Sequence, residues 1–263
     1  GDIREKDRLE RAMDGANIVI HAAALKQVPV CEYNPFEAVK TNILGAQNII
    51  EAAIDHNIDK VMAISTDKAV NPVNLYGATK MCMEKLFVAA NSYVGSNRST
   101  RMACVRYGNV VGSRGSVIPL FKKQRACGKL TITDKDMTRF WITLEEGVGF
   151  VVKCVELMKG GEVFVPKIPS MSIMDLAKTI APECGHKFTG IRPGEKLHEV
   201  LISRDESRRV LEFKDFFIIH PDFHFWSDVG IKGGKPIVAS FEYNSKDNPV
   251  YLTGKQMIKM DRG

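Results

Sequence analysis

The chain has 263 residues, 44% of them hydrophobic, which is enough apolar material for one large domain or a domain with an added lobe. Its 37 basic and 31 acidic residues give a formal charge of +6 and are mixed along the chain without a long Lys/Arg block, so nucleic-acid binding is not expected. The six scattered cysteines form no Cys-x-x-Cys pair, no apolar run approaches about 20 residues and no signal peptide is visible, so we expect a cytoplasmic protein without a metal site, a disulfide scaffold or a membrane span.

The first predicted element is a buried strand at residues 17–24, which runs into the small residues of His21-Ala22-Ala23-Ala24. Small side chains at this point would let a cofactor lie close to the backbone. Asn34 and Pro35 then mark the start of a helix, and apolar residues recur at helical spacing through Ile54.

Strands and helices continue to alternate along the chain. The predicted elements are a strand at 60–65, a helix at 75–94, a strand at 102–107, a helix at 143–158 and a strand at 162–165. This alternation predicts parallel βαβ units, and hence an α/β protein with a Rossmann-like doubly wound parallel sheet. The looser pattern elsewhere predicts a smaller carboxyl-terminal substrate-binding lobe. We expect residues 1–112 and 138–167 to form the nucleotide-binding domain and residues 113–137 and 168–263 the lobe, with the tail from Phe216 hard to assign.

The most informative block is Ser65–Lys80, which contains Tyr76-Gly77-Ala78-Thr79-Lys80. A Tyr and a Lys four residues apart on a helix lie on the same face, where the ammonium can stabilise the phenolate. Alone, this spacing also fits an ordinary surface pair. The strand 60–65 before it and the polar residues at the end of that strand favour catalysis, because open α/β sheets keep their chemistry at the carboxyl ends of their strands.

Several longer motifs occur in one order along the chain and carry a resemblance that is far more specific than the Tyr/Lys pair. The chain resembles an extended short-chain dehydrogenase/reductase and, within that superfamily, the inverting UDP-N-acetylglucosamine 4,6-dehydratases of the pseudaminic acid route. The motifs are His21–Lys26, Lys40–Ile43, Ser65–Lys80, Arg106–Ser116, Met137–Trp141, Phe164–Met171 and Ile191–Glu199.

The resemblance implies a nucleotide cofactor, yet no G-x-G-x-x-G occurs in the chain. We therefore expect an amino-terminal truncation, with the phosphate-binding turn and the first strands missing and cofactor binding by this piece weakened. The implied cofactor is NADP, with NAD as the alternative.

The resemblance also implies catalytic roles. Tyr76 would take the proton of the sugar C4 hydroxyl, and Lys80 would hold the cofactor ribose. Asp67 would be the acid that protonates the leaving C6 hydroxyl and Lys68 the base at C5, with Thr66 beside them. Dehydratases that retain C5 configuration usually carry Asp-Glu in place of Asp67-Lys68, and larger membrane-anchored ones carry Met in place of Tyr76.

Binding residues follow from the same resemblance. Asn42 is expected to be a structural amide that ties helix to sheet, and Arg114 to contact either ligand. Alternative interpretations remain for three of the residues. Lys26 could be a solvated lysine, and Arg139 or Arg192 could belong to a surface ion pair. The expected cofactor contacts are Asp2, Ile3, Ala22, Ile64, Ser65 and Val110 with Tyr76 and Lys80, and the expected substrate contacts are Lys26, Asn109, Arg139 and Arg192.

Three other functions remain open at this point. A nucleotide-sugar 4-epimerase or a retaining 4,6-dehydratase would use the same fold, and an epimerase would not need the Asp67-Lys68 pair. A non-catalytic nucleotide-binding module would bind a nucleotide without turnover. The resemblance further suggests a UDP-sugar as the ligand and a homo-oligomer as the assembly.

Overall fold

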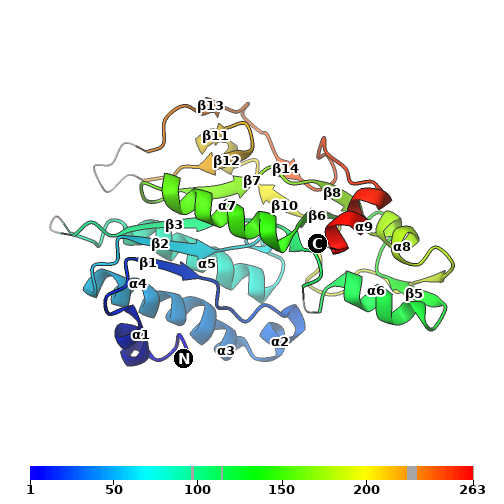
Figure 1. Cartoon of the computed structure of the whole chain (residues 1–263), viewed down its shortest axis with the longest axis horizontal. Coiled ribbons are helices and arrows are strands. Elements are labelled where there is room, and N and C mark those ends of the chain that lie inside the picture. Colours follow the sequence, from blue (N-terminus) through cyan, green and yellow to red (C-terminus); the bar gives the residue numbers. More distant parts are fainter. Residues whose placement is uncertain (96–97, 114, 224–229, 263) are drawn as a thin grey trace.

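The computed structural model describes residues 1–95, 98–113, 115–223 and 230–262 (Figure 1). Its main sheet joins four parallel strands to three antiparallel ones, which confirms the expected α/β class. The spatial order in the described part is β1 (Ile18–His21), β2 (Lys60–Ile64), β3 (Arg101–Val105), β7 (Val163–Pro166), β12 (Phe216–Ile219), β11 (Val210–Glu212) and β13 (Lys235–Pro236).

Helices cover both faces of the parallel strands (Figure 1). On β2, Val61 and Ala63 pack into one core cluster with helices α4 (Gly45–Asp55) and α5 (Leu75–Ala90). Met62 points to the opposite face and packs with Val151 of helix α7 (Leu144–Leu157). Successive strand side chains alternate between the two faces, so a strand buried on both sides reads as a continuous apolar run.

The expected helix from Asn34 to Ile54 is divided into three parts. They are α3 (Pro35–Val39), a π-helical turn (Lys40–Leu44) and α4. Asn42 is 1% exposed inside the π turn, where its amide accepts from Leu25 N at 2.8 Å and donates to Leu25 O and Thr79 Oγ1. This confirms the structural role expected for Asn42, which ties the π turn to the segment after β1 and to α5.

A smaller lobe packs beside the carboxyl ends of the parallel strands and has its own core, which includes Phe121, Leu130 and Trp141. On strand β6 (Thr138–Ile142), Trp141 points into this lobe while its neighbour Phe140 packs in the main core, so β6 connects the two. The lobe and its links contain α6 (Val117–Arg125), α8 (Ile173–Ile180), α9 (Gly254–Arg262), β4 (Asn109–Val110), β5 (Lys129–Ile132), β6 (Thr138–Ile142), β8 (Ser170–Ser172), β9 (Gly185–Phe188), β10 (Val200–Ile202) and β14 (Tyr243–Asn244). The remaining helical segments are α1 (Lys6–Met13), α2 (Val28–Tyr33) and the 3₁₀ turns Asp67–Ala69 and Glu206–Arg209.

The carboxyl-terminal part differs from the sequence expectation in one respect. Residues beyond 168 were expected in the lobe, but β12 pairs antiparallel with β7, and β11 and β13 continue the main sheet. The apolar run Phe216–Ile219 is buried on both faces, as an inner strand of the sheet requires. The main sheet is therefore built from both halves of the chain.

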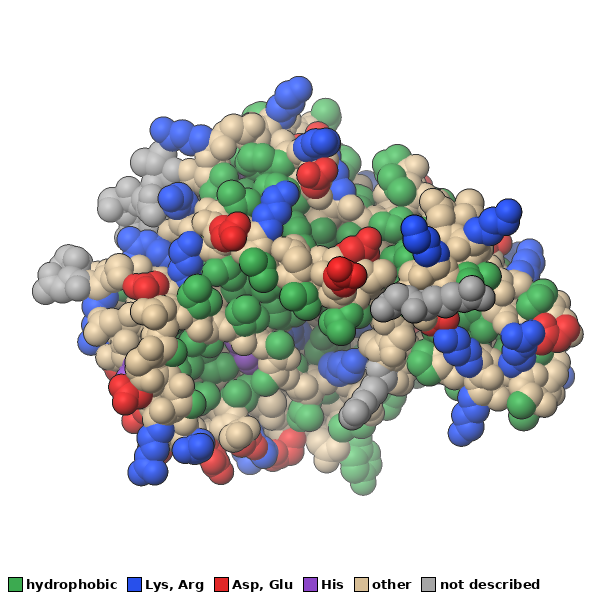
Figure 2. Space-filling model, in the orientation of Figure 1, with side chains coloured by type: hydrophobic (Ala, Val, Ile, Leu, Met, Phe, Trp, Pro, Cys, Tyr) green, Lys and Arg blue, Asp and Glu red, His purple; other side chains and the backbone are tan. Residues whose placement is uncertain are grey.

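One face of the molecule exposes apolar side chains, which gather over β1 and α7 (Figure 2). Ile18 and Ile20 of β1 are about half exposed, and Leu144, Val148 and Val152 recur every four residues along α7. This face presents an apolar surface to solvent. Among the described helices, none has the length and apolar character needed to cross a membrane.

Candidate active site

The carboxyl ends of β2 and β3 position the start of the Ser65–Lys80 block. Ser65 N donates to Val105 O at 2.7 Å and Asp67 N donates to Tyr107 O at 3.2 Å, so the backbone after β2 stays attached to the neighbouring strand. Thr66 then caps a short 3₁₀ turn that carries Asp67 and Lys68. The catalytic residues expected from the sequence thus lie at the predicted edge of the sheet.

A cavity of about 750 Å³ lies between this edge and the lobe. It brings together most of the predicted site residues. Asp67 is fully buried beneath the cavity wall, and within the described residues Asp2 and Ile3 are not part of the lining. The predicted residues that line the cavity are Ala22, Lys26, Ile64, Ser65, Thr66, Lys68, Tyr76, Lys80, Asn109, Val110, Arg139 and Arg192.

Asp2 and Ile3 lie elsewhere in the fold. The Asp2 carboxylate pairs with Arg4 at 2.6 Å, and Ile3 packs over the helix start at Gly45. Their expected contact with the cofactor stays a prediction, and Arg114 lies outside the described residues.

Helix α5 presents Tyr76 and Lys80 to the cavity. Asn74 caps the helix by accepting from Gly77 N at 2.7 Å, and its amide also donates to Gly194 O at 2.7 Å. Because the cap fixes the first turn of α5, the Tyr76 ring has a defined position at the cavity wall.

The two side chains of the Tyr/Lys pair have environments that the spacing alone did not predict. Burial lowers the pKa of Lys80 to about 8, and its Nζ donates to Ile64 O at 2.6 Å. Burial raises the pKa of Tyr76, and the neighbouring Lys68 cation opposes this most, followed by the Thr66 hydroxyl. Lys68 is therefore a further cation that favours the Tyr76 phenolate, and the role expected of Lys80 stays a prediction.

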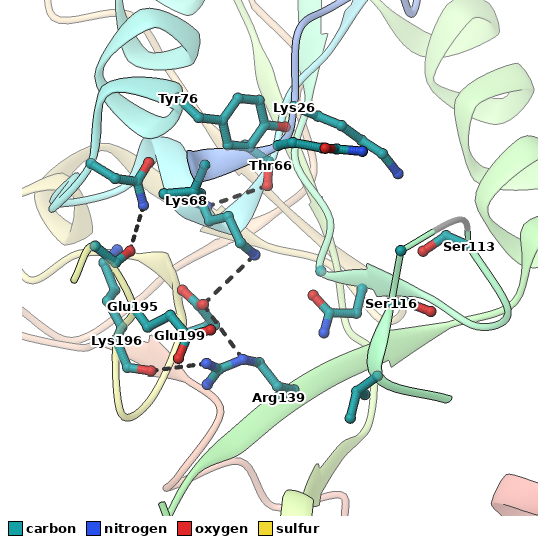
Figure 3. Close-up of a pocket in the computed structure, with 18 of the residues that line it drawn as sticks. Lys26, Thr66, Lys68, Tyr76, Ser113, Ser116, Arg139, Glu195, Lys196 and Glu199 are labelled. Carbon is teal, nitrogen blue, oxygen red and sulfur yellow. Dashed lines mark hydrogen bonds and ion pairs between the residues drawn. The ribbon is translucent and has the colours of Figure 1, made fainter. Parts of the chain in front are cut away.

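Lys68 belongs to a buried cluster of alternating charges (Figure 3). Its Nζ lies 3.0 Å from Asp67 Oδ1 and 3.6 Å from Glu199 Oε1, and Glu199 Oε1 lies 3.6 Å from Arg139 Nε. Thr66 Oγ1 also donates to Asp67 Oδ1 at 2.9 Å. Burial alone would lower the pKa of Lys68, but the Asp67 and Glu199 carboxylates raise it above its ordinary value, so Lys68 is a cation in the resting site.

Glu199 ends the Ile191–Glu199 motif but was not among the residues predicted for the site. No local pattern marks a glutamate as buried, and its two cations come from distant segments. The segment 192–199 closes one side of the cavity and is held there by contacts to the catalytic block. Lys196 Nζ donates to Val70 O, and Gly194, with φ at +78°, packs so closely on Asn74 that an added Cβ would lie 3.0 Å from Asn74 Cβ.

The predicted substrate residues have unequal freedom. The Arg139 guanidinium is buried and donates to the carbonyls of Thr138, Lys196 and Leu197. The Arg192 side chain is 60% exposed and lies 3.8 Å from Glu195. Lys26 extends along the cavity near Tyr76 (Figure 3). Of the two arginines, Arg192 is thus the freer to bind a diphosphate, and its role stays a prediction.

The low pKa of Lys80 predicts that this residue costs stability. A Lys pKa of about 8 against 10.5 in the unfolded chain corresponds to about 3 kcal/mol below pH 8. Loss of the hydrogen bond to Ile64 offsets about 1 kcal/mol of this. We therefore expect Lys80→Met to raise the free energy of unfolding by about 2 kcal/mol at pH 7 while abolishing turnover.

The pH dependence of unfolding provides the check. Between pH 8 and 10.5 the unfolded chain binds more protons than the folded chain. The free energy of unfolding of the wild type should therefore rise relative to that of Lys80→Met over this range. Urea titrations at several pH values would measure the difference, with the exposed Lys85→Met as the control. A destabilised Lys80→Met protein at pH 7 would contradict the inferred cost.

Comparisons with known proteins agree with this geometry. A family model described as "Polysaccharide biosynthesis protein" matches residues 1–221. A Campylobacter jejuni protein named UDP-N-acetylglucosamine 4,6-dehydratase (inverting) is 52% identical over 99% of this chain and 80% of its own length. A Rickettsia canadensis protein named UDP-glucose 4-epimerase is 42% identical over 93% of this chain and 74% of its own length. The solved structure of Pen from Bacillus thuringiensis superposes with a TM-score of 0.88 at 39% identity, covering 99% of this chain and 79% of that one.

Proposed function

The chain belongs to the polysaccharide biosynthesis protein family, and within it we propose that the chain acts as an inverting UDP-N-acetylglucosamine 4,6-dehydratase. Such an enzyme is a hydro-lyase that removes water across C5 and C6 of the sugar and leaves UDP-2-acetamido-2,6-dideoxy-β-L-arabino-hex-4-ulose. The similarity to the Campylobacter jejuni protein of that name supports the assignment over nearly the whole chain.

The observation that carries the proposal is the Asp67–Lys68 pair beside Tyr76. Lys68 Nζ and Asp67 Oδ1 are 3.0 Å apart, and Lys68 lines the same cavity as Tyr76. Elimination needs an acid for the leaving hydroxyl and a base for the C5 proton, and a carboxyl/amine pair can supply both. A 4-epimerase needs only oxidation and reduction at C4.

The residues at the end of β2 fit a nicotinamide nucleotide. The Ser65 hydroxyl is buried and has no partner among the described residues, and Ala22 and Ala24 leave room against the backbone. We propose that Ser65, Lys80 and Val110 hold this cofactor. When bound, the nicotinamide would accept the hydride from sugar C4 and return it to C6, so that no net redox change occurs.

The chain's own residues would manage the protons. Tyr76 would accept the C4 hydroxyl proton, with Lys68 and Thr66 favouring its phenolate against the effect of burial. Oxidation at C4 makes the C5 proton acidic. After passing its own proton to Asp67, Lys68 would remove the C5 proton, and the protonated Asp67 would give its proton to the C6 hydroxyl as it leaves.

Several finer expectations are part of the same proposal. They are NADP rather than NAD as cofactor, diphosphate binding by Arg192, a homo-oligomer, a cytoplasmic location and a place in pseudaminic acid biosynthesis. In support of a reducing compartment, all six cysteines are free thiols.

The function is tested by NMR of the protein with UDP-N-acetylglucosamine and NADP in deuterated water. We expect a 4-keto-6-deoxy product with deuterium at C5 and inverted configuration there. A C4 epimer without loss of water would support the epimerase alternative, and retention at C5 would support the retaining dehydratase. Binding without turnover would leave a nucleotide-binding module.

A further inference from the structure

Glu199 is held in place by contacts that do not involve the proposed substrate. Its backbone N donates to Ser245 Oγ at 2.9 Å, and Ser245 Oγ lies 2.7 Å from Thr138 Oγ1 on β6. Its side chain is 3% exposed, and Oε2 has no hydrogen-bond partner among the described residues. A buried carboxylate with an unpaired oxygen costs free energy, so its position calls for a function or for a compensating cation.

The charged and titratable groups around Lys68 come from four parts of the chain. Asp67 lies on the same 3₁₀ turn and Tyr76 on α5, while Arg139 comes from β6 and Glu199 and Lys196 come from the segment 192–199. Among the described residues, only Asp67, at 3.0 Å, is within hydrogen-bond distance of the Lys68 amine. Glu199, at 3.6 Å, acts on it as a charge without sharing a proton.

Since Arg139 lies 3.6 Å from Glu199, this carboxylate has a cation of its own. The four groups Asp67, Lys68, Glu199 and Arg139 together carry no net charge. Moving one proton from Lys68 Nζ to Asp67 Oδ1 produces a neutral amine and a neutral carboxylic acid, and the Glu199–Arg139 pair stays neutral as a unit. Such a transfer separates no charge, which is what a buried site permits.

We propose that Glu199 is a positioning residue for the elimination: with Arg139 it holds the Lys68 amine against Asp67, so that the one proton they share supplies both acid and base. This rests on the proposed dehydratase function. The proton passes from Lys68 Nζ to Asp67, the free amine then takes the C5 proton, and the Asp67 carboxyl gives its proton to the C6 oxygen. The C6–O bond breaks as water leaves, the C5–C6 double bond forms, and the carboxylate/ammonium pair is restored.

The test compares Glu199→Gln with wild type by two readouts. The first is NMR titration of lysine carrying ¹³C at Cε, with the Lys68 signal assigned by its loss in Lys68→Met. Because Glu199→Gln removes a carboxylate close to the Lys68 amine, the Lys68 pKa should fall by about one unit or more. This readout needs neither cofactor nor turnover.

The second readout measures elimination and C4 oxidation separately. A displaced amine should lower kcat for elimination about 10²-fold and change its pH profile, with KM for the UDP-sugar nearly constant. Single-turnover oxidation at C4, followed by absorbance of the reduced nicotinamide, should persist. Glu199→Asp keeps the charge and should recover part of the rate and of the Lys68 pKa. If Glu199→Gln does not fold, Glu199→Asp provides the comparison with wild type instead.

The matched control is Glu183→Gln, an exposed carboxylate in the lobe that pairs with Arg125. It should leave both readouts unchanged. An unaltered Lys68 pKa in Glu199→Gln, or equal losses of oxidation and elimination, would overturn the role of Glu199. Wild-type protein that binds cofactor and UDP-sugar yet eliminates no water would instead refute the proposed function, and the titration would then decide the electrostatic contact alone.

Discussion

Lys68→Met should stop elimination, whereas oxidation at C4 should be slowed but not abolished, because Tyr76 loses a cation that favours its phenolate. A positioned acid or base contributes about 10²–10⁴-fold to a rate, and Lys68 is the base proposed for C5, so we expect 4-keto-6-deoxy product to form at least 10²-fold more slowly. Reduced nicotinamide should accumulate in a single turnover, because oxidation proceeds while the hydride cannot be returned to C6. The measurement pairs NMR of the product with absorbance of the reduced cofactor.

Stability must be followed alongside the rate. Without the Lys68 ammonium, Asp67 and the more distant Glu199 lose a shared cation, and removing one partner of a buried pair costs about 3–5 kcal/mol. Thermal melts would show what fraction of the variant is folded under the assay conditions. Lys85→Met, on the exposed side of α5, is the control for loss of a lysine. Product formation at the wild-type rate by folded Lys68→Met would rule out Lys68 as the base.

The two lysines of the site, Lys68 and Lys80, differ in a way that their sequence context did not reveal. Lys68 lies beside two carboxylates, which hold it as a cation, whereas Lys80 has a backbone carbonyl and a methionine sulfur as neighbours. The spacing of Tyr76 and Lys80 correctly placed both on one face of α5. It could not give their pKa values, because those depend on groups that approach from other parts of the chain.

The same distinction applies to the fold: elements with a local sequence signal were predicted, whereas the pairing of distant segments was not. The strands β1, β2, β3 and β7 and the helices α5 and α7 follow from hydrophobic periodicity, and the structure confirms them to within a few residues. Periodicity gave no partner for the run Phe216–Ile219, since its neighbour β7 lies some fifty residues earlier. The antiparallel half of the sheet was therefore missed.

In the site, the clearest example of a contact that the sequence pattern does not reveal is the segment 192–199. Residues of the Ser65–Lys80 block are close in sequence, so their motif predicts a shared location. Glu199 and Lys196 reach the same cavity through a turn at Gly194 and through contacts with Asn74 and Val70. Such contacts between distant segments leave no periodic signal. The sequence could therefore predict that Asp67 and Lys68 lie at the end of β2, but not that Glu199 lies beside Lys68.

Gly77→Ala should be the most damaging small substitution in the site. A Cβ at Gly77 would lie 2.1 Å from Lys68 O and 3.1 Å from Pro72 Cβ, well inside van der Waals contact with a backbone atom that has no rotamer to change. Either the first turn of α5 or the 3₁₀ turn with Asp67 and Lys68 must move. Overpacking of this kind costs about 1–3 kcal/mol, and a displacement of about 1 Å at catalytic groups can cost about 10²-fold in rate.

Alanine has a higher helix propensity than glycine, so a Gly→Ala change in a helix stabilises the protein unless the new methyl group clashes. The sign of the stability change therefore shows whether packing or helix propensity dominates at a given glycine. Gly149 lies within α7, and no described atom would come within 4 Å of a Cβ there. Gly149→Ala should therefore stabilise the protein by about 0.5–1 kcal/mol, whereas Gly77→Ala should destabilise it and lose turnover. Urea unfolding and the product assay on both variants would measure the contrast. A Gly77→Ala protein as stable and active as Gly149→Ala would mean that α5 does not press on the Lys68 backbone, and that the close packing of these turns does not set the Asp67–Lys68 geometry.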